Sequence, residues 1–192
     1  MTEEIRVYTL SFFHRRQTMA IATVIAAGIG LLLASDRPAE AGIVPAATTA
    51  IVSSSSGLSI TVPANAGNLG TAANTVGGST ISGQLGEVQV NDARILTSGW
   101  VATAISTAFT PALGPAIASS NVGYSVGPIT KVATAATYTA NDPADLSAVS
   151  PVVTATGVLL FNSATWNPTI NVTVPGGTLA GVYVATITHS VT

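Results

Sequence analysis

The chain has 192 residues, of which only 7% are charged, with a formal net charge of −2 and no cysteine. So few charges exclude nucleic-acid binding, which needs a basic stripe, and argue against binding to anionic membrane surfaces. Without cysteine the chain forms neither disulfides nor thiolate metal sites, so its core alone must hold the fold.

Residues 1–41 have the features of an export signal. The basic segment His14-Arg15-Arg16 precedes an uncharged apolar run over residues 19–34, and Ala39-Glu40-Ala41 gives a small-x-small cleavage pattern before Gly42. The apolar run is shorter than the roughly 20 residues that a spanning helix needs, which favours a cleaved signal over a retained anchor. We therefore predict a signal-peptide helix that is removed on secretion to the cell surface, and no membrane segment in the mature chain.

Residues 42–57 are rich in Ala, Thr and Ser and include the serine run Ser53–Ser56. This composition is typical of a flexible linker. Residues 58–192 then have the length and the apolar content of one folded domain.

The rest of the chain consists of short strand-like runs between Gly and Pro turns. The runs cover residues 58–62, 88–91, 100–106, 121–126, 129–138, 152–161, 169–174 and 182–191. Pro175-Gly176-Gly177 separates the last two runs and predicts a hairpin from Thr169 to Val191. Helical periodicity is hard to find, because Pro111 and Pro115 interrupt the Ala-rich stretch. The pattern predicts an all-β protein, an antiparallel β-sandwich of about eight or nine short strands.

Two motifs in this domain resemble the WxL domain of Gram-positive cell-surface proteins. The first motif is Leu85-Gly86-x-Val88-x-Val90-x-Asp92-x-Arg94 followed by Gly99-Trp100, and the second is Gly181-x-Tyr183-x-x-Thr186-Ile187-Thr188, with Phe109 and Leu113 between them. In order and position, the resemblance covers most of residues 58–191.

The resemblance implies an exported β-rich domain that associates non-covalently with the cell wall. It implies peptidoglycan as the ligand, often beside a partner surface protein. Two departures stand out: Trp100 is followed by Val101-Ala102 instead of the x-Leu of the family, and His189-Ser190-Val191 replaces the second tryptophan motif. The chain is thus similar to a divergent member, and its Ala- and Gly-rich, Lys-poor composition suggests an actinobacterial one.

The residues of the family motif are expected to be structural. Asp92 and Arg94 are two apart, so on a strand their side chains face the same way. In so uncharged a protein, a partly buried arginine needs a carboxylate partner, which favours an internal pair that pins the loop before Gly99 over a grip on a ligand. Trp100 is expected to be a core anchor, and Tyr183 is placed with the structural residues of the second motif.

The candidates for ligand binding are aromatic. Trp166, flanked by Asn167 and Pro168, is the best candidate for an exposed ring that stacks on a sugar, with Tyr124 and Tyr138 as weaker ones.

Residues for catalysis or metal binding are scarce. His189 is the only histidine after the predicted cleavage site, no G-x-S-x-G elbow is present, and nothing indicates that any two carboxylates converge. The spacing of Asp142 and Asp145 does not fit a calcium loop. We therefore predict a protein that is not an enzyme and holds no metal or cofactor.

Two hypotheses for function remain. The first is an exported protein that attaches to cell-wall peptidoglycan or to another surface protein. The alternative is a self-associating structural subunit in which residues 42–57 donate a strand to the open sheet edge of a neighbour and so build a coat or fibre.

Overall fold

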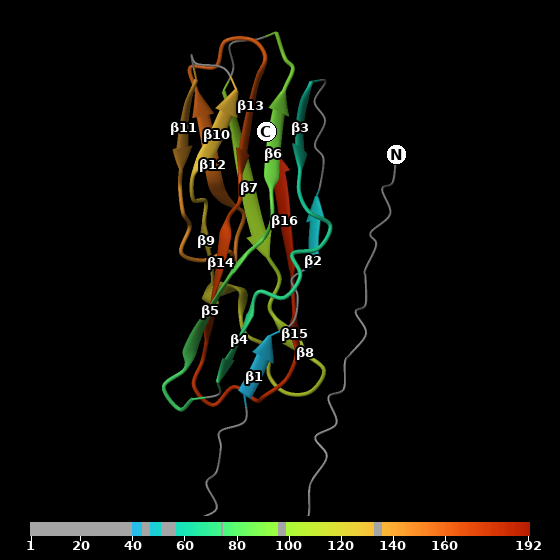
Figure 1. The fold of residues 1–192 in the computed structure, drawn as a ribbon, viewed down its shortest axis with the longest axis vertical. Coiled ribbons are helices and arrows are strands. Elements are labelled where there is room, and N and C mark those ends of the chain that lie inside the picture. Colours follow the sequence, from blue (N-terminus) through green and yellow to red (C-terminus); the bar gives the residue numbers. More distant parts are fainter. Residues whose placement is uncertain (1–39, 44–46, 51–56, 74, 96–98, 133–135) are drawn as a thin grey trace, which may run out of the picture. The chain divides into compact units, whose positions relative to one another are not determined.

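The structure is a computed structural model that describes residues 40–43, 47–50, 57–73, 75–95, 99–132 and 136–192 (Figure 1). Pro38–Thr192 forms one compact unit, and every described residue belongs to it. Residues 1–39, and with them most of the predicted signal peptide, lie outside the described residues. Within the described part, no helix is long and apolar enough to cross a membrane.

The described part is built from β-strands, with one short 3-10 turn at Ser119–Asn121. The prediction of an all-β sandwich of antiparallel sheets is thereby confirmed. The strands are more numerous than expected, because the runs over residues 129–138 and 182–191 are each divided in two and because strands such as Gly70–Ala73 and Ser79–Gln84 form outside the expected runs.

The first layer contains a four-stranded and a three-stranded antiparallel sheet. The four-stranded sheet has the order β10 (Ile129–Val132), β13 (Asn162–Trp166), β6 (Val88–Asp92) and β3 (Leu58–Thr61). The three-stranded sheet has the order β5 (Ser79–Gln84), β14 (Thr169–Val174) and β9 (Val122–Ser125).

These two sheets join end to end, because β5 leads into β6, β9 into β10, and β13 into β14. Trp166 pairs with Val88 and Ile129, whereas Thr169 pairs with Gln84 and Ser125. The segment Asn167-Pro168 therefore faces one residue more on each side, in Leu85-Gly86-Glu87 and in Val126-Gly127-Pro128. Each flanking segment contains a glycine with positive φ, +100° at Gly86 and +71° at Gly127. An extra residue with such a glycine is a β-bulge, which bends a strand without ending it. We call the joined sheets the long sheet.

The second layer is a five-stranded sheet. Its order is β11 (Thr137–Ala140), β12 (Ser150–Thr156), β7 (Trp100–Ser106), β16 (Thr186–Val191) and β2 (Ala47–Ala50). All its pairs are antiparallel except β16 with β2, which is parallel. Two small pairs complete the fold, β1 (Glu40–Ile43) with β4 (Gly70–Ala73), and β8 (Thr110–Pro111) with β15 (Tyr183–Val184).

The predicted hairpin from Thr169 to Val191 is wrong. Strand β14 pairs with β5 and β9 in the long sheet, whereas β16 pairs with β7 and β2 in the other layer. The segment after Pro175 thus connects the two layers, and β15 pairs with β8 on the way. A hairpin needs a tight loop between its strands, and the eleven residues between the ends of these two strands, Pro175 to Ala185, are far longer.

The segment expected to be a linker, residues 42–57, contains paired strands. Strand β2 lies within it, and β1 overlaps its start. Strand β1 also spans the bond between Ala41 and Gly42, where the signal is expected to be cleaved, so cleavage there would remove its first half. Backbone hydrogen bonding to β4 and β16, which composition does not reveal, orders these residues.

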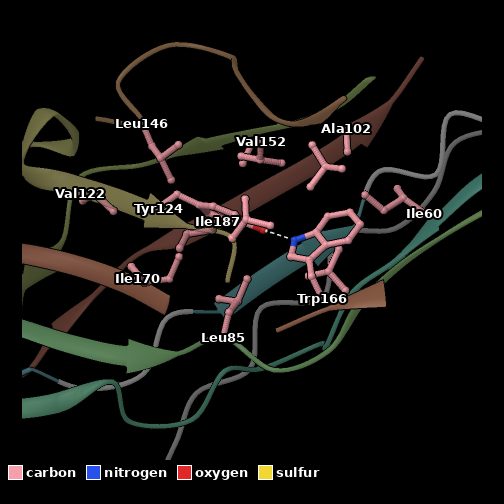
Figure 2. Close-up of a cluster of buried hydrophobic side chains, with 14 of the residues drawn as sticks. Ile60, Leu85, Ala102, Val122, Tyr124, Leu146, Val152, Trp166, Ile170 and Ile187 are labelled. Carbon is pink, nitrogen blue, oxygen red and sulfur yellow. Dashed lines mark hydrogen bonds between the residues drawn. The ribbon is translucent and has the colours of Figure 1, made fainter. Parts of the chain in front are cut away.

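The core lies between the long sheet and the five-stranded sheet. Inward positions alternate with outward ones, most regularly along β7, where every second residue from Trp100 to Ser106 is buried. Figure 2 shows part of this core, with Trp166 and Tyr124 surrounded by aliphatic side chains such as Ile60, Ile187 and Val152. Because the polar residues of the strands face outward and few of them are charged, the outer surface of the long sheet consists mainly of uncharged side chains, with the exposed Glu87 at the junction of β5 and β6.

Candidate functional site

The expected aromatic ligand site does not exist, because its main residues are buried. Trp166 is 2% exposed and Tyr124 is 1% exposed. On β13, Ala164 and Trp166 occupy the inward positions, so the tryptophan ring points into the core. Its indole N–H donates to the Tyr124 hydroxyl at 2.9 Å, as the dashed line in Figure 2 shows. The prediction that Trp166 stacks on a ligand is therefore wrong, and so is that for Tyr124.

The same hydrogen-bond chain continues to a buried histidine. The Tyr124 hydroxyl lies 3.1 Å from Nε2 of His189, which is fully buried. An indole N–H only donates, so the Tyr124 oxygen accepts from Trp166 and its own proton points to Nε2. The histidine proton is then on Nδ1, which has no hydrogen-bond partner in the described part of the chain. Burial lowers the pKa of His189 to about 4 and raises the pKa of Tyr124.

The predicted pair of Asp92 and Arg94 is present. Nε of Arg94 donates to Oδ1 of Asp92 at 2.8 Å, and Nη2 donates to Oδ2 at 3.0 Å. Burial raises the pKa of the Asp92 carboxyl, but hydrogen bonds from Arg94 and Asn162 outweigh it, so the net pKa is lowered. Nη2 of Arg94 also donates to the carbonyl of Gly99 at 3.1 Å. This contact ties the loop before β7 to the end of β6, as a structural role requires.

Asn162 connects this ion pair to two aromatic side chains, Trp100 and Tyr138. Its Oδ1 accepts from Nε1 of Trp100 at 2.9 Å and from the Tyr138 hydroxyl at 3.3 Å. Its Nδ2 donates to Oδ2 of Asp92 at 3.1 Å and to the Leu160 carbonyl at 3.2 Å. The amide thus uses its full hydrogen-bonding capacity within the chain.

The other motif residues also have internal partners. Trp100 is buried as expected, and the Tyr138 ring packs against it at a centroid distance of 5.7 Å. Tyr183 is fully buried, and its hydroxyl donates to the Leu179 carbonyl at 2.8 Å. Gly99 packs against β12 so closely that a Cβ there would collide with the Ala155 carbonyl. All these residues serve the fold, and of the three aromatic side chains only that of the partly exposed Tyr138 reaches the surface.

Sequence reasoning missed the polar surface of the long sheet. Outward-facing amide and hydroxyl side chains from β5, β6, β13, β14 and the β13–β14 junction form a row there, which we call the amide face: Ser82, Gln84, Gln89, Asn91, Thr165, Asn167 and Asn171. Period-two alternation could have identified the outward positions, but not that the strands lie side by side.

Hydrogen bonds join neighbours along the amide face. Asn171 accepts from Ser82 at 2.7 Å and donates to Ser125 at 3.1 Å, so it bridges β5 and β9 across β14. Asn167 donates to Gln84 at 3.1 Å and accepts from the backbone N–H of Gly86 at 3.1 Å. Each of these bonds uses part of the capacity of an amide, which has two N–H donors and two acceptor lone pairs. The face therefore keeps donors and acceptors for a ligand.

The seven side chains of the amide face are uncharged, but the exposed carboxylate of Glu87 lies at the junction of β5 and β6, opposite Asn167-Pro168. No acidic or basic side chain points outward from β5, β6, β9, β13 or β14, since Asp92, the one charged residue on these strands, is buried. Such a surface suits an uncharged partner with many hydroxyl groups and offers nothing to a phosphate polymer.

A shallow depression of about 270 Å³ lies at one end of the amide face. It is lined by Asn91, Asp92, Ala93, Val132, Phe161, Asn162 and Ser163. The carboxylate and amide of its buried residues Asp92 and Asn162 are already hydrogen-bonded, so its accessible walls come from Val132 and Phe161 together with the exposed Asn91 and Ala93. The depression lies where the amide face meets the apolar end of the β-sandwich.

The described residues contain no group of three or more His, Asp or Glu side chains that could hold a metal ion. No protein-family model matches the chain, and no curated protein matches it.

Proposed function

We propose that the chain is an exported, non-enzymatic cell-surface protein that associates non-covalently with the glycan of cell-wall peptidoglycan through its amide face. The observation that carries the proposal is the uncharged row of hydrogen-bonded amides and hydroxyls on the long sheet. Sugar hydroxyls both donate and accept, and amide side chains offer both in return.

The regular spacing of outward-facing side chains adds to the fit with a polymer. Outward-facing residues recur about every 7 Å along a strand, and neighbouring strands lie about 4.8 Å apart. A long glycan strand can therefore contact several side chains at once. Each contact is weak, because a net hydrogen bond contributes only about 1 kcal/mol. Several contacts along one polymer add up to useful retention.

The resemblance to WxL domains supports the same proposal. It rests on the motif from Leu85 to Trp100 and on the strand around Tyr183. In this chain those residues pack the core and pin loops, so the motif supports the scaffold, and the ligand surface lies elsewhere. Absence of enzymatic activity is supported by His189, whose full burial keeps it from any substrate.

The test is sedimentation of the purified chain with isolated peptidoglycan. Asn171→Ala combined with Gln84→Ala removes two amides from the face, and we expect about thirty-fold weaker retention from two lost hydrogen bonds of about 1 kcal/mol each. The matched control is Asn141→Ala, because Asn141 donates to Thr154 at 3.0 Å at the edge of the other sheet. Equal retention of the double variant and the wild type would overturn the proposal.

The same assay separates glycan from a partner surface protein. Walls stripped of protein with protease should still retain the chain, and walls digested with a muramidase should not. Retention that depends on the protease-sensitive fraction would assign the attachment to a partner protein instead.

One observation favours the alternative of a structural subunit. Strand β2 closes the edge of the five-stranded sheet by pairing in parallel with β16, over Ala47–Thr186 to Ala50–His189. The same strand from a second copy could make the same backbone bonds, as in strand exchange. Size-exclusion chromatography over a wide concentration range tests this: a monomer throughout contradicts strand exchange, and oligomers that disappear when residues 38–50 are deleted support it.

A further inference from the structure

One end of the β-sandwich has an exposed apolar surface that the proposed function does not use. Val132 ends β10 and pairs with Ser163, next to the loop that contains Leu159, Leu160 and Phe161. These four side chains, which we call the apolar tip, are between 53% and 68% exposed. Ile95, also exposed, follows β6 on the loop that leaves the same end. Contiguous exposed apolar groups of this kind mark contact surfaces.

The backbone holds the tip in an unfavourable conformation. Leu160 has φ of +56°, in the left-handed region that branched residues avoid. Its carbonyl accepts the 3.2 Å hydrogen bond from Asn162, which Trp100 and Asp92 fix in turn. The strained backbone at Leu160 lowers the stability of the fold, yet the hydrogen bond from Asn162 keeps these apolar side chains on the surface. Such strain tends to occur at functional sites.

The charges near the tip are positive or neutralised. Lys131 and Arg94, the two basic residues after the predicted cleavage site, both lie at this end. Asp92 is buried and bonded to Arg94. Lys131 is exposed, and its Nζ lies 5.6 Å from the centroid of the Tyr138 ring. Among the described residues, this end thus combines aliphatic and aromatic side chains with one exposed cation and no exposed carboxylate.

The opposite end gives a natural comparison. Leu113 is 85% exposed there, and a Cβ on its neighbour Gly114 would touch Leu179, which is also exposed. No basic residue accompanies these side chains within the described part of the chain. Apolar exposure therefore occurs at both ends, but only the tip pairs it with positive charge.

We propose that the apolar tip inserts into the interfacial region of a lipid layer with anionic headgroups, with Lys131 at the level of the headgroups. Interfacial binding grows with the apolar area buried and with attraction to anionic lipid, and a lysine can extend its amine to the headgroups while its stem lies on apolar surface. The low charge content and the net charge of −2 argued against binding to an anionic lipid surface. The electrostatic energy of a local contact, however, depends mainly on charges within about 10 Å of it. A lipid contact goes beyond the proposed glycan binding and involves a different surface.

The test is co-sedimentation of residues 38–192, which form a compact unit, with vesicles of phosphatidylcholine alone or mixed with phosphatidylglycerol. Omitting residues 1–37 removes the apolar run of the signal, which would bind vesicles itself. Cooperative thermal unfolding, followed by circular dichroism, verifies the fold of every variant. Leu160→Asn with Phe161→Ser removes apolar area and places a residue that tolerates the left-handed region at position 160. Leu113→Ser is the control at the opposite end.

We expect the wild type and Leu113→Ser to sediment with the anionic vesicles. The double tip variant should bind at least about ten-fold more weakly, and Lys131→Gln should lose most of the preference for anionic over zwitterionic vesicles. Absence of vesicle binding by the folded wild type would overturn the proposal, as would equal binding by the folded double variant. If the tip variant instead loses retention on protein-bearing walls while no form binds vesicles, the tip contacts a protein. The peptidoglycan assay with the amide-face variants is independent of all these outcomes.

Discussion

Trp100 and Asn162 join the two layers of the fold through one hydrogen bond of 2.9 Å between Nε1 and Oδ1. Trp100 begins β7 in the five-stranded sheet, and Asn162 begins β13 in the long sheet. The amide also holds Asp92 and the Leu160 carbonyl, so one buried side chain positions the ion pair and the loop of the apolar tip.

Replacing Asn162 with alanine should therefore destabilise the fold. The change leaves the buried indole N–H of Trp100 without its acceptor and removes one of the two hydrogen bonds to Oδ2 of Asp92, which keeps the bond from Arg94. We expect a loss of about 3 kcal/mol in the free energy of unfolding. Urea denaturation measures it. Asn141→Ala, which removes a single exposed hydrogen bond, should cost less than about 0.5 kcal/mol. A similar small loss for Asn162→Ala would contradict the central role of this amide.

His189 should make stability depend on pH in a defined window. Its pKa falls from 6.5 to about 4 on burial, so the unfolded chain takes up a proton at a higher pH than the folded chain does. The contribution of His189 to the free energy of unfolding should be fully present above about pH 6.5 and should be lost as the pH falls toward 4, by about 3 kcal/mol in total. Urea denaturation at several pH values within this window measures the decline.

His189→Gln provides the matched variant for this window. Glutamine keeps an acceptor for the Tyr124 hydroxyl but does not titrate. The free energy of unfolding of this variant should change little between about pH 6.5 and pH 4, whatever its value at neutral pH. An unchanged decline would assign the pH dependence to other groups.

The strands were predictable because alternation has a local cause. At residues 58–62 and 169–174 apolar and polar residues alternate, and the structure has β3 and β14 there. The same rule also places Trp166 inward, two residues after the buried Ala164. Its neighbours Asn167 and Pro168 suggested an exposed loop, but they belong to the junction between β13 and β14.

Pairing and networks were not predictable in the same way. Alternation shows which face of a strand is buried, but not which strand lies beside it, so the hairpin after Thr169 was misassigned. The bond from Trp100 to Asn162 joins residues 62 apart in the sequence, and no local pattern marks it. Phe161 was included in the predicted strand over residues 152–161. The chain instead leaves β12 at Thr156, and Gly157, with φ of +65°, turns it into the loop.

Glycine at the bulges of the long sheet should be required to different degrees. Gly127→Ala places the new Cβ 3.7 Å from the Asn167 carbonyl oxygen, an ordinary van der Waals contact, so it should cost only the strain of a positive φ, about 1 kcal/mol. Gly86→Ala adds a clash with the Pro63 ring, 2.6 Å from the new Cβ, and should cost more. Thermal unfolding of the two variants measures the difference, and Gly127→Asn should recover part of the loss. Equal effects at both positions would show that the Pro63 contact relaxes freely.

Arg94→Met tests whether the pair with Asp92 serves the fold or a ligand. The variant leaves a buried carboxylate without its cation, so we expect a loss of about 3 kcal/mol at neutral pH. Asp92 has a lowered pKa in the native chain, so the stability it contributes is present above its ordinary pKa of 3.8 and is lost as pH falls below it. Without the Arg94 side chain, only the hydrogen bonds from Asn162 and from the backbone N–H of residue 94 oppose the effect of burial, so the pKa of Asp92 should be higher than in the wild type. Protonation of the carboxyl should then relieve part of the penalty, and the difference in stability between variant and wild type should shrink in acid.

Two measurements complete this test. The double variant Asp92→Asn, Arg94→Met removes both charges and should recover part of the lost stability, because no unpaired buried charge remains. Retention on peptidoglycan should follow the folded fraction of each variant, since the pair faces the Gly99 loop and the amide face does not include it. Lost retention in Arg94→Met with unchanged stability would instead place the pair in the ligand site, where its exposed edge borders the depression beside Asn91.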